Sequence, residues 1–171
     1  MGSICIQVLE PKELLLRVGQ AAHHEYFLIA GVLRSWIGDA QGCEVTLDFS
    51  VGPGILTPAI ARVFADHSRI NCQALTHARL ARFDASALVT LMRAVPNAQL
   101  WGDAVLRAEL MRRVDREWEL AALPAAQRLE LFQQKFPALD GRVAQHYIAS
   151  YLGITPVSLS RLKAKIRSKI V

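Results

Sequence analysis

The chain has 171 residues, a mass of 18.9 kDa and a mean hydropathy of +0.22, a length that suits one or two domains. Hydrophobic residues make up 52% and charged residues 20%, so a core can form and wholesale disorder is excluded. No run approaches the roughly 18 to 20 apolar residues of a membrane helix. Near the N-terminus, Glu10, Lys12 and Glu13 occur before any apolar stretch is long enough for a signal peptide. We therefore expect a soluble, cytoplasmic protein with no membrane partner.

The three cysteines, Cys5, Cys43 and Cys72, lie far apart and form no CxxC pair. This spacing argues against a disulfide framework, a zinc ribbon and a cysteine-ligated iron–sulfur cluster. Cys43 and Cys72 lie in strand-like segments, where we expect small buried thiols rather than reactive ones. We predict no metal site and no cofactor.

Two short clusters contain residue types that occur in catalytic and metal sites. His23, His24 and Glu25 are adjacent, but neighbours on a strand point to opposite faces, so we expect surface positions in a loop or hairpin. Residues 66–68, Asp-His-Ser, have the composition of a hydrolase triad, yet a triad needs residues that converge from separate segments. We therefore predict that the protein is not an enzyme.

The positive charge is concentrated at the C-terminal end. The chain carries a formal net charge of +5, but residues 141–171 hold six basic and no acidic side chains, which gives +6. The other 140 residues carry 14 basic and 15 acidic side chains and contribute −1. A polyanion such as nucleic acid is one natural partner for this segment. The alternative is a lysine-rich helix end that complements its own dipole and keeps the protein soluble.

Up to Asp84, the sequence consists of short strand-like runs separated by glycine-bearing turns. Residues 38–42 are predicted to connect a hairpin, and 59–65 to form a helical turn after an irregular stretch of glycine and proline. Several short strands with frequent turns predict a small β-sandwich or roll. The expected strands are 13–18, 25–30, 32–37, 44–49, 70–76 and 78–83.

After Asp84, the hydrophobic period becomes helical. Asp84 is expected to cap a short helix that ends before Pro96. An uninterrupted helix follows over 97–123, about 40 Å long at 1.5 Å per residue. Pro124 is expected to end it and to start another helix, which Pro137 ends.

The predicted helix at 97–123 has an apolar stripe with spacings of three and four residues. Val105, Leu106 and Leu110 widen the apolar surface toward a second face, so the helix needs two neighbours. One neighbour can be the β domain and the other the same helix of a second copy, although packing only within its own chain is the alternative. The predicted dimer-helix residues are Leu100, Trp101, Ala104, Ala108, Met111, Val114 and Trp118.

Residues 145–162 have the pattern of two helices joined by a tight turn. Crossing helices need a small residue where they meet, which Ala149 supplies, and a turn residue that tolerates positive φ, which Gly153 supplies. Thr155 is expected to cap the second helix, and Pro156 to occupy its first turn. The apolar residues expected to join the helices are Ile148, Leu152, Ile154, Leu159 and Leu162.

This helix pair, together with the charge around it, predicts a unit that reads DNA. A recognition helix places its N-terminal side chains against base edges and its basic side chains against phosphates. Arg161 and Ser158 are expected near bases, because arginine can bind guanine with two hydrogen bonds. Similar helix pairs also occur in proteins that bind no DNA, and that alternative stays open. The residues predicted to face DNA are Gln145, His146, Thr155, Pro156, Val157, Ser158, Ser160, Arg161, Lys163, Lys165 and Arg167.

Sequence cues along most of the chain follow the order found in a known family. The C-terminal cue is Tyr-Ile-Ala-Ser-Tyr-Leu-Gly-Ile-Thr-Pro at 147–156, and N-terminal cues include 14–19 and Gly-Val-Leu-Arg at 31–34. On these residues the chain resembles bacterial transcription regulators of the Crp/Fnr superfamily. The resemblance implies an α+β fold with an N-terminal double-stranded β-helix, jelly-roll-like and of cyclic-nucleotide-binding type, over 1–96. It also implies a long dimerisation helix over 97–123 and a small all-α helix–turn–helix domain over 124–171.

The predicted effector site departs from the family pattern. Members that bind a cyclic nucleotide carry Gly-Glu-Leu and Arg-Ser-Ala segments for the ribose and phosphate, whereas 51–56 here has no glutamate. An alignment on Ala74 puts Ser68 at the arginine position, so we expect no cyclic-nucleotide binding unless Arg69 serves instead. The effector-pocket residues that the resemblance implies are Gly52, Ile55, Leu56, Ser68 and Arg69.

Val157 is a second departure, because the family often has a glutamate there that accepts from a cytosine amino group. Valine can contact a thymine methyl group but cannot accept that hydrogen bond, so the DNA site should differ from the usual one. We predict a homodimeric DNA-binding regulator, with RNA polymerase and an unidentified effector as further candidate partners. The alternative is a ligand-sensing or protein-interaction module whose helix–turn–helix no longer reads DNA.

Overall fold

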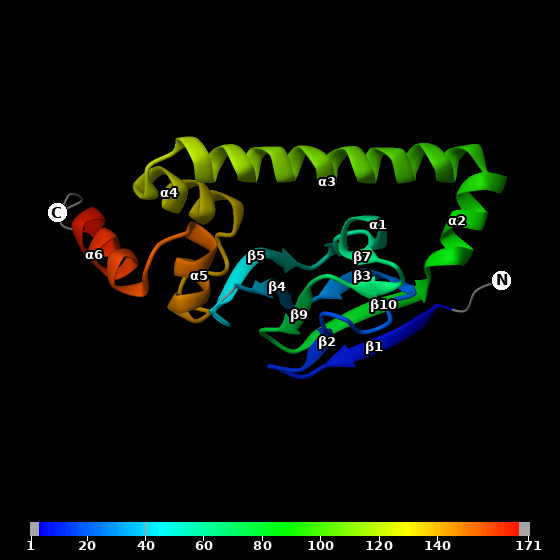
Figure 1. Cartoon of the computed structure of the whole chain (residues 1–171), viewed down its shortest axis with the longest axis horizontal. Helices are drawn as coiled ribbons and strands as arrows, with labels where there is room; N and C mark the ends of the chain where they lie inside the picture. Colours follow the sequence, from blue (N-terminus) through cyan, green and yellow to red (C-terminus); the bar gives the residue numbers. More distant parts are fainter. Residues whose placement is uncertain (1–3, 40, 168–171) are drawn as a thin grey trace. The chain divides into compact units, whose positions relative to one another are not determined.

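Strands dominate up to Asp84 and helices follow, which gives the α+β fold that the sequence predicts (Figure 1). The computed structural model describes residues 4–39 and 41–167. The chain divides into two compact units, Met1–Ile37 with Leu47–Arg113, and Gly38–Thr46 with Val114–Val171. In chain order, the elements are β1 (Cys5–Leu9), β2 (Leu14–Leu16), β3 (His24–Ala30), β4 (Val32–Gly38), β5 (Glu44–Val51), β6 (Gly54–Ile55), α1 (Ala59–Arg62), β7 (Val63–Phe64), β8 (His67–Ser68), β9 (Asn71–Ala74), β10 (Ala78–Asp84), α2 (Ala85–Ala94), α3 (Pro96–Ala122), α4 (Ala125–Lys135), α5 (Gln145–Leu152) and α6 (Pro156–Arg167).

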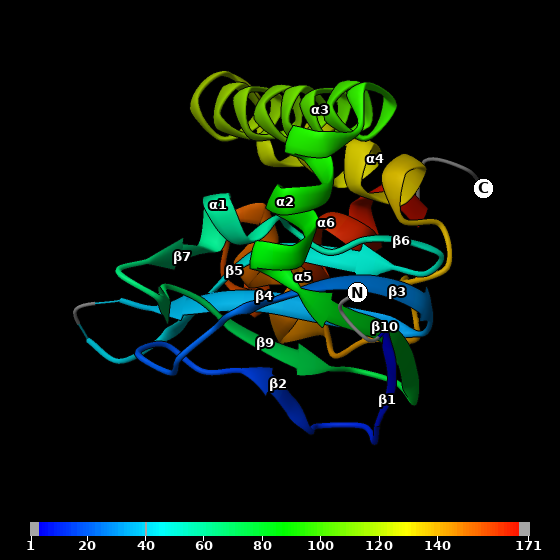
Figure 2. The same ribbon diagram turned by 90° about the vertical axis from the view of Figure 1, so that its right-hand side faces the viewer.

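Two four-stranded sheets form the β-roll (Figure 2). One sheet has the strand order β1-β10-β3-β6 and the other β2-β9-β4-β5, while β7 and β8 form a separate hairpin. The register places Leu80 opposite Leu28 in the first sheet and Ala74 opposite Leu33 in the second, and all four are buried. Because side chains alternate along a strand, these residues turn inward and enclose an apolar core. The core residues are Leu9, Leu15, Leu16, Ala22, Tyr26, Leu28, Leu33, Leu56, Cys72, Ala74, Ala78 and Leu80.

The observed strands include the six predicted ones, with small differences at their ends. β1 is not among the predicted strands, although it pairs with β10 along its whole length. The predicted helical turn at 59–65 is wrong beyond Arg62, because Val63 and Phe64 form β7 and pair with β8. Ala65 and Asp66 have φ values of 48° and 63°, the geometry of a two-residue hairpin turn. This turn lacks the usual glycine, so its sequence looks like a continuing helix.

Gly31 connects β3 to β4 in a backbone conformation that excludes other residues. Its φ is +104°, and a Cβ atom there would lie 2.6 Å from the carbonyl oxygen of His77 and 2.7 Å from the Cα of Ala78. These are backbone atoms at the start of β10, which cannot move without disturbing the strand. Only glycine therefore allows the two sheets to be connected at this point.

Asp84 starts the helical part of the chain, as predicted. Its Oδ1 accepts hydrogen bonds from the N–H groups of Ser86 at 2.7 Å and Ala87 at 3.1 Å, which satisfy the first turn of α2. The Ser86 hydroxyl and these amides hold the pKa of the Asp84 carboxyl below its ordinary value. α3 begins at Pro96, where a missing N–H costs nothing, and continues for 27 residues. Of the helices in the described residues, none is long and apolar enough to cross a bilayer.

A second apolar core holds α4, α5 and α6 together in the second unit. The ring centroids of Phe132 and Phe136 are 5.4 Å apart, and those of Phe132 and Tyr151 are 5.6 Å apart, in tilted arrangements that aromatic pairs favour. This core is separate from that of the roll, which is typical of a distinct small domain. Its buried residues are Leu129, Phe132, Phe136, Leu139, Val143, Ile148, Ala149, Tyr151, Leu152 and Leu159.

The predictions for Cys43 and for His24 and Glu25 are wrong, whereas His23 is exposed and lies just before β3, as predicted. Cys43 is exposed, because it precedes β5 in the hairpin connection, whereas Cys72 is buried as predicted. Burial raises the pKa of the Cys72 thiol to about 12, which leaves it unreactive. His24 and Glu25 are half-buried rather than in a surface loop, because β3 is an interior strand between β10 and β6.

The contact at Gly31 predicts unequal costs for two glycine substitutions. Gly19 has φ +78°, but a Cβ atom added there would meet nothing within 4 Å, so Gly19→Ala should cost only the backbone strain, about 1–2 kcal/mol. In Gly31→Ala the new Cβ atom also clashes with the backbone of His77 and Ala78, so this variant should lose more free energy of unfolding than Gly19→Ala. Urea unfolding of both variants measures this difference. Equal losses of unfolding free energy would mean that the backbone around His77 moves and relieves the clash.

Candidate nucleic-acid interface

A tight turn joins α5 to α6, the two helices predicted to form the DNA-reading unit (Figure 1). Gly153 ends α5 with φ 65° and ψ 36°, a left-handed conformation that glycine adopts without strain. Its N–H donates to the carbonyl of Ser150 at 3.1 Å, and the N–H of Ile154 donates to the carbonyl of Ala149 at 3.0 Å. These bonds satisfy carbonyl groups at the end of α5, so the predicted role of Gly153 is confirmed.

Apolar side chains pack between α5 and α6. Ala149 is fully buried, as a residue at the meeting of two helices should be, and Leu152 and Leu159 are buried with it. Ile154 and Leu162 are half-buried at the edge of this contact. A larger side chain at position 149 would separate the helices, because a packed interior has no spare volume.

Thr155 caps α6 as predicted. Its Oγ1 accepts a hydrogen bond from the N–H of Ser158 at 3.1 Å and lies 2.9 Å from the Ser158 hydroxyl. Pro156 is the first residue of α6, a position that suits its fixed φ and missing N–H. The start of the predicted recognition helix is therefore rigid before any ligand arrives.

Most of the side chains predicted to face DNA are exposed. Val157 is 60% exposed, and Arg161 is exposed and makes no hydrogen bond or ion pair within the described part of the chain. Arg167 is the last described residue of α6, and its side chain lies outside the described residues. The exposed residues of the predicted set are Gln145, His146, Thr155, Pro156, Val157, Ser158, Ser160, Arg161 and Lys165.

Part of the charge of Lys163 is used inside the second unit. Its Nζ lies 2.5 Å from Oδ1 of Asp140 and donates to Oε1 of Gln145 at 2.7 Å. The hydrogen bond from Lys163 is the main reason that the pKa of the Asp140 carboxyl is lowered. Lys163 therefore ties α6 to the start of α5 and supplies less free positive charge than Arg161.

A hollow of 290 Å³ lies on the face that carries these polar residues. It brings Gln145 at the start of α5 beside Ser160 and Lys163 on α6. No side chain caps α5 at Ala144 within the described residues, so N–H groups of its first turn are available to an acceptor such as a phosphate oxygen. The full lining is Gln145, Pro156, Leu159, Ser160, Lys163 and Ala164.

Two polar anchors of α5 are not among the predicted residues. The Ser150 hydroxyl donates to the carbonyl of Glu44 at 3.0 Å and accepts from the N–H of Thr46 at 2.8 Å. The Arg116 guanidinium donates to the carbonyl of Tyr151 and lies 3.7 Å from the centre of its ring. Both anchors join residues far apart in the sequence, so periodicity and spacing carry no signal for them.

The predicted dimer helix presents its apolar stripe to solvent. Trp101, Met111 and Trp118 are each about half exposed, although such side chains usually find apolar partners. Val105 and Leu106, on another side of α3, are half-buried and line an apolar cavity of 410 Å³ together with residues of β3 and α2. All seven predicted residues are exposed, namely Leu100, Trp101, Ala104, Ala108, Met111, Val114 and Trp118.

The residues predicted for an effector pocket lie in different environments. Leu56 is part of the roll core, and the buried Ser68 hydroxyl donates to the carbonyl of Ile70 at 2.7 Å. Arg69 is exposed, with its guanidinium 5.8 Å from the ring centre of Phe64. An exposed arginine beside an aromatic ring is not arranged to bind a buried phosphate.

The remaining two effector-pocket residues also differ from each other. Gly52 donates its N–H to the carbonyl of Gly31 at 3.0 Å, and Ile55 lines the apolar cavity of 410 Å³. Arg62 is fully buried in the roll, as is Arg34, and sequence reasoning did not single out Arg62. No local sequence signal marks Arg62 as buried, because its counter-ion Glu25 lies far away in the sequence.

The His-containing clusters do not form a catalytic or metal site. The Nδ1 of His67 contacts the carbonyl of Ala65 at 2.6 Å, while the Ser68 hydroxyl is bonded to Ile70, so the two side chains do not form a pair. Within the described residues, no group of three or more His, Cys, Asp or Glu side chains could hold a metal ion.

Solved structures confirm the α+β fold, in which a roll of two sheets is followed by a long helix and a C-terminal helix pair. FixK2 from Bradyrhizobium japonicum matches with a TM-score of 0.84 at 17% identity, over 98% of this chain and 86% of that one. CLP from Xanthomonas campestris, described as a global regulator responsive to c-di-GMP, matches with 0.76 at 16%, over 97% and 87%. A CooA mutant from Carboxydothermus hydrogenoformans matches with 0.75 at 19%, over 97% and 77%. Comparison with protein-family models gives no match, and comparison with curated sequences gives none either.

Proposed function

We propose that the protein is a homodimeric transcription regulator that binds specific DNA sequences through α5 and α6. The observation that carries this proposal is the exposed face of α6, where Val157, Ser158 and the unpaired Arg161 stand on a rigid helix start within the described residues. Residues 141–171 contain no acidic side chain that would repel DNA phosphates. The chain also shares its fold with CLP, which is described as a global regulator of gene expression, and this supports the proposed function. We propose no enzymatic activity for it.

The proposed roles follow from where each side chain stands on the helix pair. Arg161 and Ser158 face base edges, since the N-terminal half of a recognition helix enters the major groove. Lys163, Lys165 and Arg167 face the phosphate backbone, with Lys163 contributing less because of Asp140. Gln145, His146, Thr155, Pro156 and Ser160 complete the surface that approaches the duplex.

Dimerisation follows from the exposed stripe on α3. A helix with apolar residues at spacings of three and four buries them against an equivalent helix in a coiled-coil contact. Two copies of α6 would then read the two halves of a symmetric site. We further propose that the protein acts in the cytoplasm, where RNA polymerase is a candidate partner.

Removing the Arg161 charge should weaken duplex binding in a salt-dependent way. We expect Arg161→Ala to make the slope of log affinity against log salt shallower by about one per protomer, if the guanidinium contacts a phosphate, or to relax base preference if it contacts guanine. Fluorescence anisotropy with mixed genomic fragments at several salt concentrations measures this. Arg17→Ala, an exposed arginine in the roll, is the charge-matched control and should leave the slope unchanged. A flat salt dependence of the native protein would favour a module that no longer reads DNA.

Val157 should give the DNA site a thymine preference. Its side chain is 60% exposed and can contact a thymine methyl group. Selection of bound duplexes from a random pool should therefore recover a two-fold symmetric site with thymine at one position of each half. The same selection with Val157→Ser should lose preference at that position only. A native site with cytosine–guanine pairs at every conserved position would contradict the assignment.

A charge in the middle of the α3 stripe should prevent dimerisation. Met111 is about half exposed in the single chain, so Met111→Glu should fold normally but place a carboxylate in the proposed contact between helices. Sedimentation equilibrium should report a monomer for this variant and a dimer for Met111→Leu, which keeps the apolar contact. A Met111→Glu dimer as stable as the native one would exclude this face as the interface.

A further inference from the structure

The sheet β1-β10-β3-β6 is apolar on both of its faces. Leu80 and Leu28 belong to the roll core, so their neighbours in each strand point outward. An antiparallel sheet usually has one apolar face and one polar face in contact with water. The outer face here instead has an apolar row in which each residue lies opposite the next on the neighbouring strand, namely Ile6, Ala81, Phe27 and Ile55.

α2 and the first part of α3 cover this outer face only in part. Phe27 and Ile55 each remain 39% exposed, and together with residues of α2 and α3 they line the apolar cavity of 410 Å³. All of the residues that line the cavity belong to the first unit. Its volume lies within the range of ligand pockets, about 300–1,000 Å³.

Gly102 sets how α2 and α3 meet at the wall of the cavity. It is buried in α3, although glycine lowers helix stability relative to alanine. A Cβ atom at this position would lie 2.1 Å from Cε and 2.9 Å from Sδ of Met92, a residue of α2 that also lines the cavity. Gly102 therefore makes room for the end of the Met92 side chain, and the space beside it stays open.

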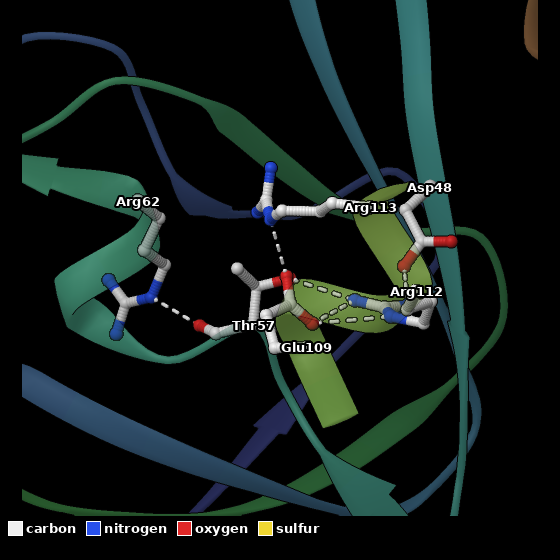
Figure 3. Close-up of polar contacts among 6 residues, drawn as sticks. All are labelled: Asp48, Thr57, Arg62, Glu109, Arg112 and Arg113. Atoms are coloured by element: carbon white, nitrogen blue, oxygen red, sulfur yellow. Dashed lines mark hydrogen bonds and ion pairs between the residues drawn. The ribbon is translucent and has the colours of Figure 1, made fainter. Parts of the chain in front are cut away.

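Polar contacts fix two other walls of the cavity (Figure 3). Arg112 pairs with Asp48 of β5, so α3 is held to the roll shortly after Val105 and Leu106. The Nε of Arg62 donates to the carbonyl of Thr57 at 3.0 Å, next to the lining residue Pro58. The cavity is therefore formed by the fold itself, as ligand pockets usually are.

The volume favours a small molecule over a helix of a partner protein. A single turn of α-helix, 10–12 Å wide with its side chains and 5.4 Å long, fills about 400–600 Å³. The cavity of 410 Å³ therefore has room for one turn at most. Phe27, Phe83 and Trp101 are aromatic residues of its lining, and aromatic rings pack well against a flat apolar molecule.

Glu25 determines the charge and polarity that the cavity accepts. It is the one charged residue among the described residues that line the cavity, and its side chain is 13% exposed. Its carboxylate accepts from the N–H of Ala59 at 2.9 and 3.1 Å, which leaves acceptor capacity for a further donor. An anionic ligand would be repelled by Glu25 in surroundings of low dielectric constant.

We propose that this cavity binds a small, uncharged and largely apolar molecule that carries one hydrogen-bond donor. The apolar part packs against Phe27 and Trp101, and the donor reaches the carboxylate of Glu25. Among the described residues that line the cavity, Ile55 is the only one that belongs to the effector pocket implied by the sequence. The proposal does not depend on DNA binding.

The test uses 1-naphthol as a probe, because it is a flat apolar molecule with one hydroxyl group. The chain has three methionines, so ¹³C labelling of their methyl groups gives few signals. Titration of the full chain with 1-naphthol should shift the Met92 signal until it saturates, whereas Met111, exposed on α3, should not respond. 1-Naphthoate has the same ring with a negative charge and should bind at least about tenfold more weakly, and so should 1-methylnaphthalene, which has no donor.

Two variants fill the cavity from different sides. Gly102→Ala forces the end of Met92 toward the cavity, and Val105→Phe adds a ring to its wall. Both should stay folded and bind 1-naphthol at least about tenfold more weakly than the native protein, because the space is already occupied. Gly38→Ala is the matched control, since a Cβ atom there meets nothing within 4 Å, and it should bind as the native protein does.

Each result supports or overturns the proposal. An unchanged Met92 signal, native affinity in both cavity variants, or 1-naphthoate binding as tightly as 1-naphthol overturns it. If one cavity variant does not fold, the other decides. Binding by Met111→Glu but not by the native protein would mean that a second copy covers the cavity, which also overturns the proposal. None of these measurements involves DNA, so they remain decisive if the proposed function fails.

Discussion

The close packing of α5 against α6 is the contact on which the proposed DNA surface depends. Ala149 allows the helices to meet, Gly153 turns the chain, and Thr155 starts the second helix within a few residues. Because these three features are local, the direction of α6 is set by a short stretch of chain and needs no ligand. The exposed side chains of α6 are therefore held on a rigid support, which reduces the entropy lost when they bind.

Charge is used in two different ways in the two units. In the second unit Arg161 is exposed and unpaired within the described residues, while Lys163 is shared with Asp140 and Gln145. In the first unit Arg62 faces Glu25, and Arg112 faces Asp48. The second unit therefore carries exposed charge on its proposed DNA surface, and the first unit uses ion pairs to hold its own elements together.

Local patterns in the sequence predict most of the elements and the turn of the helix pair, but few of the polar contacts. The cap at Asp84 and the turn at Gly153 depend on residues within a few positions, so their signals are readable. The β7–β8 turn was hidden because Ala65 and Asp66 adopt positive φ without a glycine. The pairs Arg62–Glu25 and Arg112–Asp48 join residues that only the fold brings together, so spacing cannot predict them.

Ser150 has a consequence for solubility as well as for α5. β5 is the edge strand of its sheet, and an edge leaves backbone N–H and C=O groups open to another chain. The Ser150 hydroxyl occupies the N–H of Thr46 and the carbonyl of Glu44 at the beginning of that edge. A single side chain thus blocks the place where a strand from a neighbouring molecule would begin to pair, and protects the protein against association through its sheets.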